Sequence, residues 1–203
     1  FFHVLLPDGT FGVDLFFVLS GFLITNKLLE SVKNANYFRN FYIRRCLRIF
    51  PLYYVVLLIF YFGGIFMFSE QGSNTIFYYL YNKKIWFLTF TQNLLFINEG
   101  MPKMPYLTHL WSIAIETQFY FIWPFFILLI KNKIQWICVL IVSILALRFY
   151  FYWNTPSKEV YYFHTLTRVD SMLIGSLLSM FSKKNKMPKK FWLYFYSFMF
   201  LFI

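Results

Sequence analysis

Charged residues are scarce in this chain of 203 residues: they make up 13% of it, against 60% for hydrophobic residues, and the mean hydropathy is +0.57. Soluble domains carry about twice that share of charge, so a soluble core is excluded. Several apolar runs reach the roughly 20 residues that cross a bilayer as a helix. Helices are required there, because lipid leaves an open backbone without hydrogen bonds. We predict an all-α fold, a polytopic integral membrane helical bundle.

Cysteine and histidine are also rare. Two cysteines, Cys46 and Cys138, are too few for a disulfide framework, and we interpret both as free thiols. The three histidines, His3, His109 and His164, lack the spacing of zinc ligands, so we expect no metal.

The chain lacks an initiating Met, and its start shows neither the basic segment nor the cleavage site of a signal peptide. Targeting is therefore expected to come from the spans themselves. The last apolar run, residues 191–203, is too short to cross a bilayer. We expect a single membrane domain over residues 1–203, truncated at both ends.

About seven full or partial spans are predicted from the apolar runs. The full spans are residues 11–29, 49–68, 110–130, 134–153 and 161–181, and the partial ones are residues 1–6 and 191–203. The segment 86–97 is apolar but has only about 12 residues, which is too short to span. We predict a re-entrant or interfacial helix there, on the extracytoplasmic side.

The basic residues fall mainly in alternate loops, which explains the net charge of +11 better than nucleic-acid binding does. Thirteen of the 19 lie in one set of loops: Lys27, Lys33, Arg39, Arg44, Arg45, Arg48, Lys131, Lys133, Lys183, Lys184, Lys186, Lys189 and Lys190. The opposite loops hold four: Lys83, Lys84, Lys103 and Lys158. The positive-inside bias therefore places the richer set in the cytoplasm.

Ionisable residues within spans are costly and are candidates for function. On the predicted orientation they all fall in the extracytoplasmic halves of their spans: His3, Asp14, His109, Glu116, Arg148, Arg168 and Asp170. This distribution predicts an outward-facing polar pocket, in which His and carboxylates can act as acid and base.

Each of these residues also has a structural interpretation. Asp14 could cap a helix, His109 could be an interfacial residue at a helix start, and Arg148 could extend to the surface. Arg168 and Asp170 lie two residues apart, on different helix faces, so we expect each to pair with a neighbouring helix. Buried Glu116 needs a partner that the sequence does not name.

The segment Arg44-Arg45-Cys46-Leu47-Arg48 is a basic loop just before a predicted span. Arg44 and Arg48 would lie one helical turn apart, where their guanidinium groups could bind phosphates. The simpler interpretation is a topology determinant that contacts lipid headgroups.

Three segments in order resemble the acyltransferase-3 family of membrane-bound acyltransferases, which O-acetylate bacterial surface polysaccharides. They are GVDLFFVLSGFLIT at residues 12–25, RRCLRIFP at 44–51 and HLWSIAIETQFY at 109–120. A weaker fourth is TRVD at 167–170 with Gly175. The family's usual Glu-Glu-Gln-Phe-Tyr reads Glu116-Thr117-Gln118-Phe119-Tyr120 here, without the second Glu.

The resemblance implies a membrane-bound O-acyltransferase that moves an acyl group, expected to be acetyl, from cytoplasmic acyl-CoA to a hydroxyl of an extracytoplasmic glycan or similar acceptor. The bacterial plasma membrane is the expected location, and no metal is involved. His3 fits the His of the family's first-span motif and would be the general base, with Glu116 or Asp14 orienting it. The phosphates of acyl-CoA would bind Arg44, Arg45 and Arg48. The substrate pocket would include His109, Trp111, Ser112, Arg168 and Asp170.

Other functions stay open at this point. A proton-coupled transporter would use the same intramembrane His and carboxylates, although no two-fold repeat is visible. A polysaccharide flippase or polymerase is a further alternative. Consumption of acyl-CoA in the presence of an acceptor would separate the acyltransferase from all of these.

Overall fold

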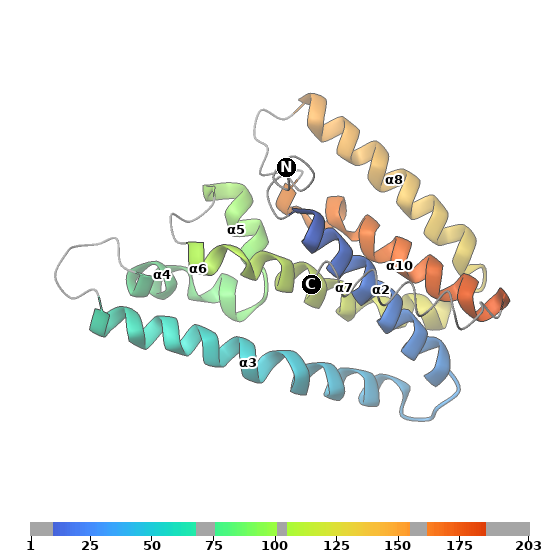
Figure 1. Ribbon diagram of the computed structural model, residues 1–203, viewed down its shortest axis with the longest axis horizontal. Coiled ribbons are helices and arrows are strands. Elements are labelled where there is room, and N and C mark those ends of the chain that lie inside the picture. Colours follow the sequence, from blue (N-terminus) through green and yellow to red (C-terminus); the bar gives the residue numbers. More distant parts are fainter. Residues whose placement is uncertain (1–9, 68–75, 101–104, 155–161, 186–203) are drawn as a thin grey trace, which may run out of the picture. The chain divides into compact units, whose positions relative to one another are not determined.

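The computed structural model describes residues 10–67, 76–100, 105–154 and 162–185 (Figure 1). Within these segments the chain is helical and contains no strand. The helices are α2 (Thr10–Ser31), α3 (Tyr37–Met67), α4 (Ile76–Leu88), α5 (Gln92–Glu99), α6 (Pro105–Thr108), α7 (Leu110–Leu129), α8 (Lys133–Asn154) and α10 (Thr165–Asn185). The all-α prediction is therefore confirmed.

Four of these helices are long and apolar enough to cross a membrane, at Gly12–Ser31, Tyr37–Phe62, Leu110–Leu129 and Lys133–Asn154. They correspond to the first four full spans predicted from the sequence. The fifth predicted span is present as α10, but α10 is not among the four. Its start carries Arg168 and Asp170 and its end carries lysines, which lower its apolarity. The predicted partial spans, residues 1–6 and 191–203, lie outside the described residues.

The basic segment at Arg44 to Arg48 is helical, which corrects the prediction of a loop. It forms part of α3, whose 31 residues extend for about 46 Å. The hydrocarbon core of a bilayer is only about 30 Å thick, so a helix of this length has room for a charged segment outside the lipid tails. The arginines are thus fixed to a rigid helix that continues directly into the span.

The described residues divide into two compact units, which are considered separately. Unit 1 comprises residues 1–32 and 115–203, and unit 2 comprises residues 33–114. α7 is one continuous helix whose first turn belongs to unit 2 and whose remainder belongs to unit 1. The expectation of a single domain over residues 1–203 stays a prediction.

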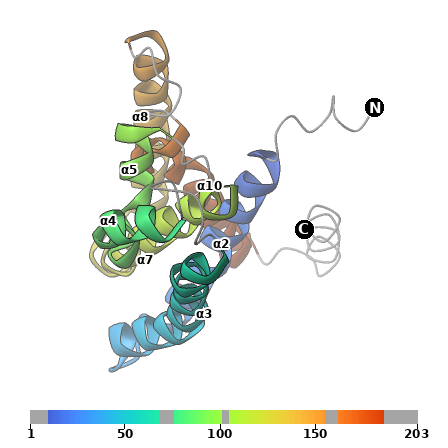
Figure 2. The same ribbon diagram turned by 90° about the vertical axis from the view of Figure 1, so that its left-hand side faces the viewer.

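In unit 1, α10 lies beside α2 and α8 (Figure 1 and Figure 2). α2 and α10 approach so closely at two glycines that side chains have no room. A Cβ atom at Gly21 would lie within 3.0 Å of the Met172 carbonyl oxygen, and one at Gly175 would lie as close to the Val18 carbonyl oxygen. Small residues allow two helix backbones to lie this close together in membrane proteins. Van der Waals packing, and not the hydrophobic effect, drives helix association there.

In unit 2, α4 and α5 form a helical hairpin, and α4 packs against α3 (Figure 1). Lys83 of α4 and Glu99 of α5 form an ion pair across it, and the rings of Phe87 and Phe96 meet 6.4 Å apart between their centres. The prediction of one continuous helix at residues 86–97 is therefore wrong, because α4 ends at Leu88 and α5 begins at Gln92. The chain turns at Thr89, Phe90 and Thr91 between two shorter helices, and the re-entrant or interfacial location of this segment stays a prediction.

The reversal is a Schellman motif that ends α4. The Thr91 amide donates to the Trp86 carbonyl at 2.9 Å, and the Phe90 amide donates to the Phe87 carbonyl at 3.4 Å. Phe90 occupies the left-handed position, with a φ of 56°, that glycine usually takes. The backbone cost for a larger residue there is about 1–2 kcal/mol. Burial of a phenylalanine ring contributes about 1.5–3 kcal/mol, enough to offset that cost.

The ring of Phe90 is buried among aromatic residues of α3. It lies 4.4 Å from the ring of Tyr53, 5.1 Å from that of Phe50 and 5.9 Å from that of Tyr54, measured between ring centres. The Tyr53 hydroxyl donates to the Phe87 carbonyl at 2.8 Å, and the Tyr54 hydroxyl donates to the Leu88 carbonyl at 3.0 Å. Carbonyls at a helix end lack intrahelical donors, so α3 supplies them to the tip of the hairpin.

Candidate functional site

Two ion pairs gather at one end of unit 1. Nη1 of Arg168 lies 2.9 Å from Oδ1 of Asp14 on α2, and Nη1 of Arg148 on α8 lies 2.7 Å from Oδ2 of Asp170. The expectation that Arg168 and Asp170 each pair with a neighbouring helix is therefore confirmed. Two simpler interpretations are wrong. Asp14 lies four residues inside α2, too far from its start to cap it, and Arg148 binds a carboxylate on α10.

Arg168, like Asp170, is almost fully enclosed, with 4% of the residue exposed. Its Nε donates to the Tyr162 carbonyl at 3.0 Å, and its guanidinium lies 4.3 Å from the centre of the Tyr162 ring. A buried charge needs such partners, because its transfer from water to an apolar interior is costly. Asp14 is more exposed, at 37% of its side chain, so it presents a carboxylate at the edge of this ion pair.

The helix directions in unit 1 follow from its contacts. Asp14 and Arg168 join the starts of α2 and α10, while Lys183 near the end of α10 contacts residues near the end of α2. α2 and α10 are therefore parallel. Arg148 lies near the end of α8 and pairs near the start of α10, so α8 is antiparallel to both. Asp14, Arg148, Arg168 and Asp170 thus share one end of the unit, as the alternation of spans predicted.

Glu116 is buried in α7 and its partner is a hydroxyl group. The Tyr120 hydroxyl donates to Oε1 of Glu116 at 2.7 Å, and Ser20 of α2 shares a hydrogen bond with the same hydroxyl. Because Tyr120 gives its proton to the carboxylate, Ser20 is the donor in the second bond. The sequence contained a cue for Tyr120, since a residue four positions after Glu116 lies on the same helix face. Nothing in the sequence pointed to Ser20.

A second chain of hydrogen bonds joins α7, α2 and α10. Nε1 of Trp123 donates to Oγ1 of Thr25 at 2.8 Å, and Thr25 donates to Oγ of Ser176 at 2.8 Å. Ser176 donates in turn to the Met172 carbonyl at 2.9 Å. All three side chains are buried. A buried polar group without a hydrogen bond would destabilise the fold, so these bonds provide the partners that the three groups need.

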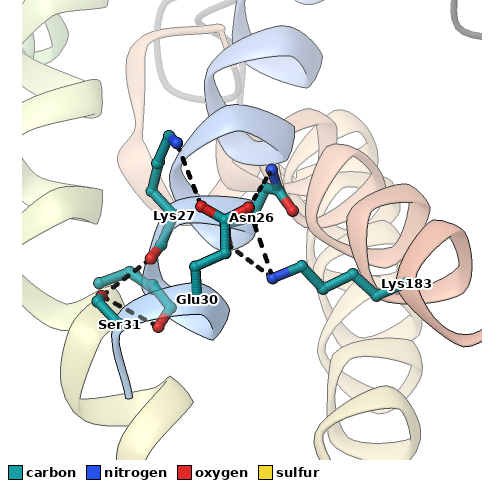
Figure 3. Close-up of polar contacts among 6 residues, drawn as sticks. Asn26, Lys27, Glu30, Ser31 and Lys183 are labelled. Carbon is teal, nitrogen blue, oxygen red and sulfur yellow. Dashed lines mark hydrogen bonds and ion pairs between the residues drawn. The ribbon is translucent and has the colours of Figure 1, made fainter. Parts of the chain in front are cut away.

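The opposite end of unit 1 is also polar, but its side chains are exposed (Figure 3). Lys183 reaches from α10 to α2, where its Nζ donates to the Asn26 carbonyl at 3.1 Å and lies 3.9 Å from Glu30. Lys27 pairs with Glu30 at 3.1 Å along α2. Figure 3 shows the Glu30 carboxylate between the two lysines. Basic side chains therefore dominate this end, in contrast to the paired charges at the other.

In unit 2, the predicted phosphate-binding residues lie on α3. Arg44 and Arg48 are exposed, one turn apart, and Arg45 is half-buried with its guanidinium 6.0 Å from the centre of the Phe41 ring. Two exposed guanidinium groups at this spacing can bind a phosphate with several charge-assisted hydrogen bonds. The ring contact holds Arg45 along the helix.

The predicted pocket residues at the start of α7 divide by exposure. His109 precedes the helix and is exposed, Ser112 donates to the His109 carbonyl at 2.9 Å, and Trp111 is buried. The position of His109 fits the interfacial interpretation. The predicted base, His3, lies outside the described residues. Among the described residues, no three His, Cys, Asp or Glu side chains lie close enough together to hold a metal ion.

Gln118, two residues after Glu116, joins two helices of unit 1. The family motif has a second Glu where this chain has Thr117, and the next residue, Gln118, accepts a hydrogen bond from the Thr165 hydroxyl at the start of α10. Gln118 therefore joins α7 to α10, one residue after the substituted position. The polar contacts of unit 1 thus connect α7 to α2 through Glu116 and Tyr120, and to α10 through Gln118.

Comparison with known proteins gives consistent results. The chain is 35% identical to the peptidoglycan O-acetyltransferase OatA of Listeria monocytogenes over 187 residues, which are 84% of this chain and 29% of that protein. It is 32% identical to a Staphylococcus aureus protein named "Putative O-acetyltransferase" over 202 residues, 91% of this chain and 33% of that protein. The chain thus spans about a third of the length of these relatives.

A third relative is the Bacillus subtilis protein named "Putative peptidoglycan O-acetyltransferase YrhL", which is 32% identical over 205 residues, 90% of this chain and 31% of that protein. No solved structure matches the chain. The acyltransferase-3 model, described as an acyltransferase domain, matches residues 1–203. With the helical architecture and these relatives, the match shows that the chain is an integral membrane protein segment that belongs to the acyltransferase-3 family of acyltransferase domains.

Proposed function

We propose that this chain is the membrane part of an O-acetyltransferase that transfers an acetyl group from cytoplasmic acetyl-CoA to a hydroxyl of an extracytoplasmic glycan. The observation that carries the proposal is the family match over residues 1–203, together with relatives named for O-acetylation of peptidoglycan. A glycan of the bacterial cell wall is accordingly the acceptor class to test first. The bacterial plasma membrane is the proposed location.

The proposed orientation places the arginines of α3 at the cytoplasmic face and the ion pairs of α2, α8 and α10 toward the outer face. The distribution of basic residues supports it, because 13 of the 19 lie in the loops assigned to the cytoplasm. The exposed lysines at the ends of α2 and α10 would then lie on the cytoplasmic side. Acetyl-CoA would approach from the side on which it is synthesised, and the acceptor from the other.

In the proposed reaction, Arg44, Arg45 and Arg48 bind the phosphates of acetyl-CoA, and the pantetheine arm carries the thioester into the membrane domain. His3 removes the proton from the acceptor hydroxyl as its oxygen attacks the thioester carbonyl. A new C–O bond forms, the C–S bond breaks, and the proton passes to the departing CoA thiolate. The products are the acetylated acceptor and free CoA.

The carboxylates have different proposed roles. Glu116, or alternatively Asp14, orients the imidazole of His3 and balances its charge when it holds the proton. Each carboxylate also has another partner, since Asp14 pairs with the buried Arg168 and Glu116 accepts a hydrogen bond from Tyr120. Arg168 and Asp170, with His109, Trp111 and Ser112, would line the pocket that receives the acceptor. The two ion pairs would keep that pocket polar without leaving a net charge.

The test uses the full-length protein in sealed vesicles, with radiolabelled acetyl-CoA on the cytoplasmic side and peptidoglycan fragments on the other. We expect label on the glycan. His3→Gln should lower turnover by about 10²–10⁴, because the amide cannot accept the proton, while expression stays normal. Arg44→Ala combined with Arg45→Ala should mainly raise the KM for acetyl-CoA, because these contacts lie far from the reacting atoms.

This function would be contradicted by wild-type protein that leaves acetyl-CoA unconsumed when acceptor is present, as expected for a transporter or flippase. Near-normal turnover of His3→Gln would contradict only the role of His3, and would move the search for the base to Glu116 or His109. The orientation has its own test: a cysteine at Ser73 should react with an impermeant reagent outside cells, and a cysteine at Asn185 should not.

A further inference from the structure

His164 of unit 1 is a half-buried histidine that the proposed reaction does not use. It directly precedes α10, and Nδ1 of its ring accepts a hydrogen bond from the Leu166 amide at 3.2 Å. The amide and the hydroxyl of Thr167 donate to the His164 carbonyl at 3.0 Å and 2.8 Å. The ring of Phe151 on α8 lies 6.2 Å from the imidazole, measured between ring centres. The backbone and the ring of His164 are therefore both held at the start of α10.

The bond at Nδ1 decides where the imidazole carries its proton. A backbone amide can donate only to a ring nitrogen without a proton, so the single proton of the neutral ring lies on Nε2. Within the part of the chain that the structure describes, Nε2 has no hydrogen-bond partner. It is also not among the buried polar atoms that are closed to solvent. His164 thus presents one N–H donor that the protein itself does not use.

Capping of α10 explains only one side of this imidazole. The residue before a helix needs an acceptor for the first amides, and Ser, Thr, Asp and Asn are the residues that usually supply it. Nδ1 makes that bond here, but a cap has no need of a second nitrogen with a proton. The donor at Nε2 therefore needs a different explanation.

The donor lies at the end of unit 1 that carries the ion pairs. Arg168 follows His164 by four residues, so the two lie one turn apart on the same side of α10. Arg168 binds Asp14, whose carboxylate is 37% exposed. That carboxylate accepts hydrogen bonds, whereas Nε2–H of His164 donates them. A sugar is complementary to such a pair, because each of its hydroxyl groups can donate and its oxygens can accept.

We propose that His164 binds the glycan acceptor, with Nε2–H donating to a sugar oxygen one turn from the ion pair of Asp14 and Arg168. This inference rests on the proposed function, because it takes the acceptor to be a glycan that reaches this end of unit 1. His164 is not a second base, since Nε2 already carries the proton and the Leu166 amide occupies Nδ1. The contact is the same before and during acetyl transfer, so its loss raises the KM for the acceptor and leaves kcat nearly unchanged.

Two substitutions separate the roles of the two ring nitrogens. His164→Asn keeps an acceptor for the Leu166 amide, because Asn is a favoured cap, but its shorter side chain does not reach the place of Nε2. His164→Gln carries an amide N–H that can reach the place of Nε2, and it is the poorer cap. Ile174→Ala is the matched control, since Ile174 is an exposed side chain further along α10.

The kinetic experiment varies each substrate in turn in the vesicle assay with full-length protein. We expect His164→Asn to raise the KM for the peptidoglycan fragment about three- to tenfold, the effect of one lost hydrogen bond between neutral groups. Its kcat and its KM for acetyl-CoA should stay within about twofold of wild type. His164→Gln should keep the KM for the fragment within about twofold, although its melting temperature in detergent should be lower than that of His164→Asn. Ile174→Ala should match wild type in all of these values.

A binding measurement distinguishes failure of this inference from failure of the proposed function. Purified full-length protein in detergent is titrated with a labelled peptidoglycan fragment in the absence of acetyl-CoA. His164→Asn should weaken the Kd by the same factor of about three to ten. If wild-type protein consumes no acetyl-CoA but shows this difference in Kd, the proposed function fails and the glycan contact stands.

Three outcomes overturn the glycan contact. One is a wild-type KM and Kd for the fragment in His164→Asn, which would mean that Nε2–H binds only water. Another is an equal loss of affinity in His164→Asn and His164→Gln, which would assign the loss to packing of the imidazole. The third is wild-type protein that does not bind the fragment at all.

Discussion

The two units of this chain solve the same problem, the burial of polar groups in an apolar protein, by different means. Unit 1 pairs charges and hydroxyls between helices, with ion pairs at one end and hydrogen-bonded Ser, Thr, Tyr and Trp side chains further along. Unit 2 buries a chain reversal under aromatic rings and caps its carbonyls with tyrosine hydroxyls. Unit 1 therefore depends on polar pairs between helices, and unit 2 depends on aromatic packing around a turn.

The largest expected loss of stability comes from breaking the ion pair of Asp14 and Arg168 in unit 1, in which the guanidinium is buried. Asp14→Ala leaves the guanidinium of Arg168 buried without its carboxylate, and we expect a loss of about 3 kcal/mol, near the low end for such pairs because Tyr162 still contacts it. Unfolding in SDS mixed micelles measures this. Arg168→Met added to Asp14→Ala should recover part of the loss. If Asp14→Ala alone is as stable as wild type, the ion pair does not hold α2 to α10.

The helix crossing in unit 1 should be the next most sensitive feature. Gly175→Ala forces its methyl group against the Val18 carbonyl, and overpacking of this kind costs about 1–3 kcal/mol. Gly12→Ala is the matched control on α2, because a Cβ at Gly12 meets nothing within 4 Å. Melting temperatures in detergent would compare the two. Equal values would contradict the close approach of the helices.

The hairpin tip of unit 2 should respond more weakly to loss of a single hydroxyl. Tyr53→Phe removes a buried donor from the Phe87 carbonyl, which we expect to cost about 1 kcal/mol. Tyr54→Phe is the paired control, since Tyr54 is more exposed and water can replace its hydroxyl. Hydrogen exchange of the amides at residues 89–91 would detect the local change. Faster exchange in Tyr54→Phe than in Tyr53→Phe would contradict this prediction, because it would show that the Tyr54 hydroxyl contributes more to the stability of the turn.

The exposed contacts of Lys183 should matter least (Figure 3). Its side chain and that of Glu30 are 35% and 47% exposed, so Lys183→Ala should change stability by less than about 1 kcal/mol. High salt should reduce the difference further, because ions screen exposed charges. A loss that rivals Asp14→Ala in the same SDS assay would mean that both ends of unit 1 are equally important for its stability.

Sequence reasoning succeeded where the information was local. The apolar runs gave the membrane helices, and the two-residue separation of Arg168 and Asp170 predicted different partners for them. It failed where partners come from distant segments. Nothing near Glu116 in the sequence indicates Ser20, a hundred residues away, and nothing near Arg148 indicates Asp170 rather than the surface. The reversal at Phe90 was missed because phenylalanine is not a residue that usually adopts a left-handed conformation.

The sequence by itself determined the membrane class, the helices and the family resemblance, because hydropathy, helical length and short motifs depend on neighbouring residues. Only the tertiary structure decided which carboxylate is paired with which guanidinium, which hydroxyls hold Glu116, and that residues 86–97 turn back at Phe90. The physical reason is that a buried polar group takes its partner from whichever helix packs against it. That choice depends on helix contacts such as those at Gly21 and Gly175, which bring together segments about 150 residues apart.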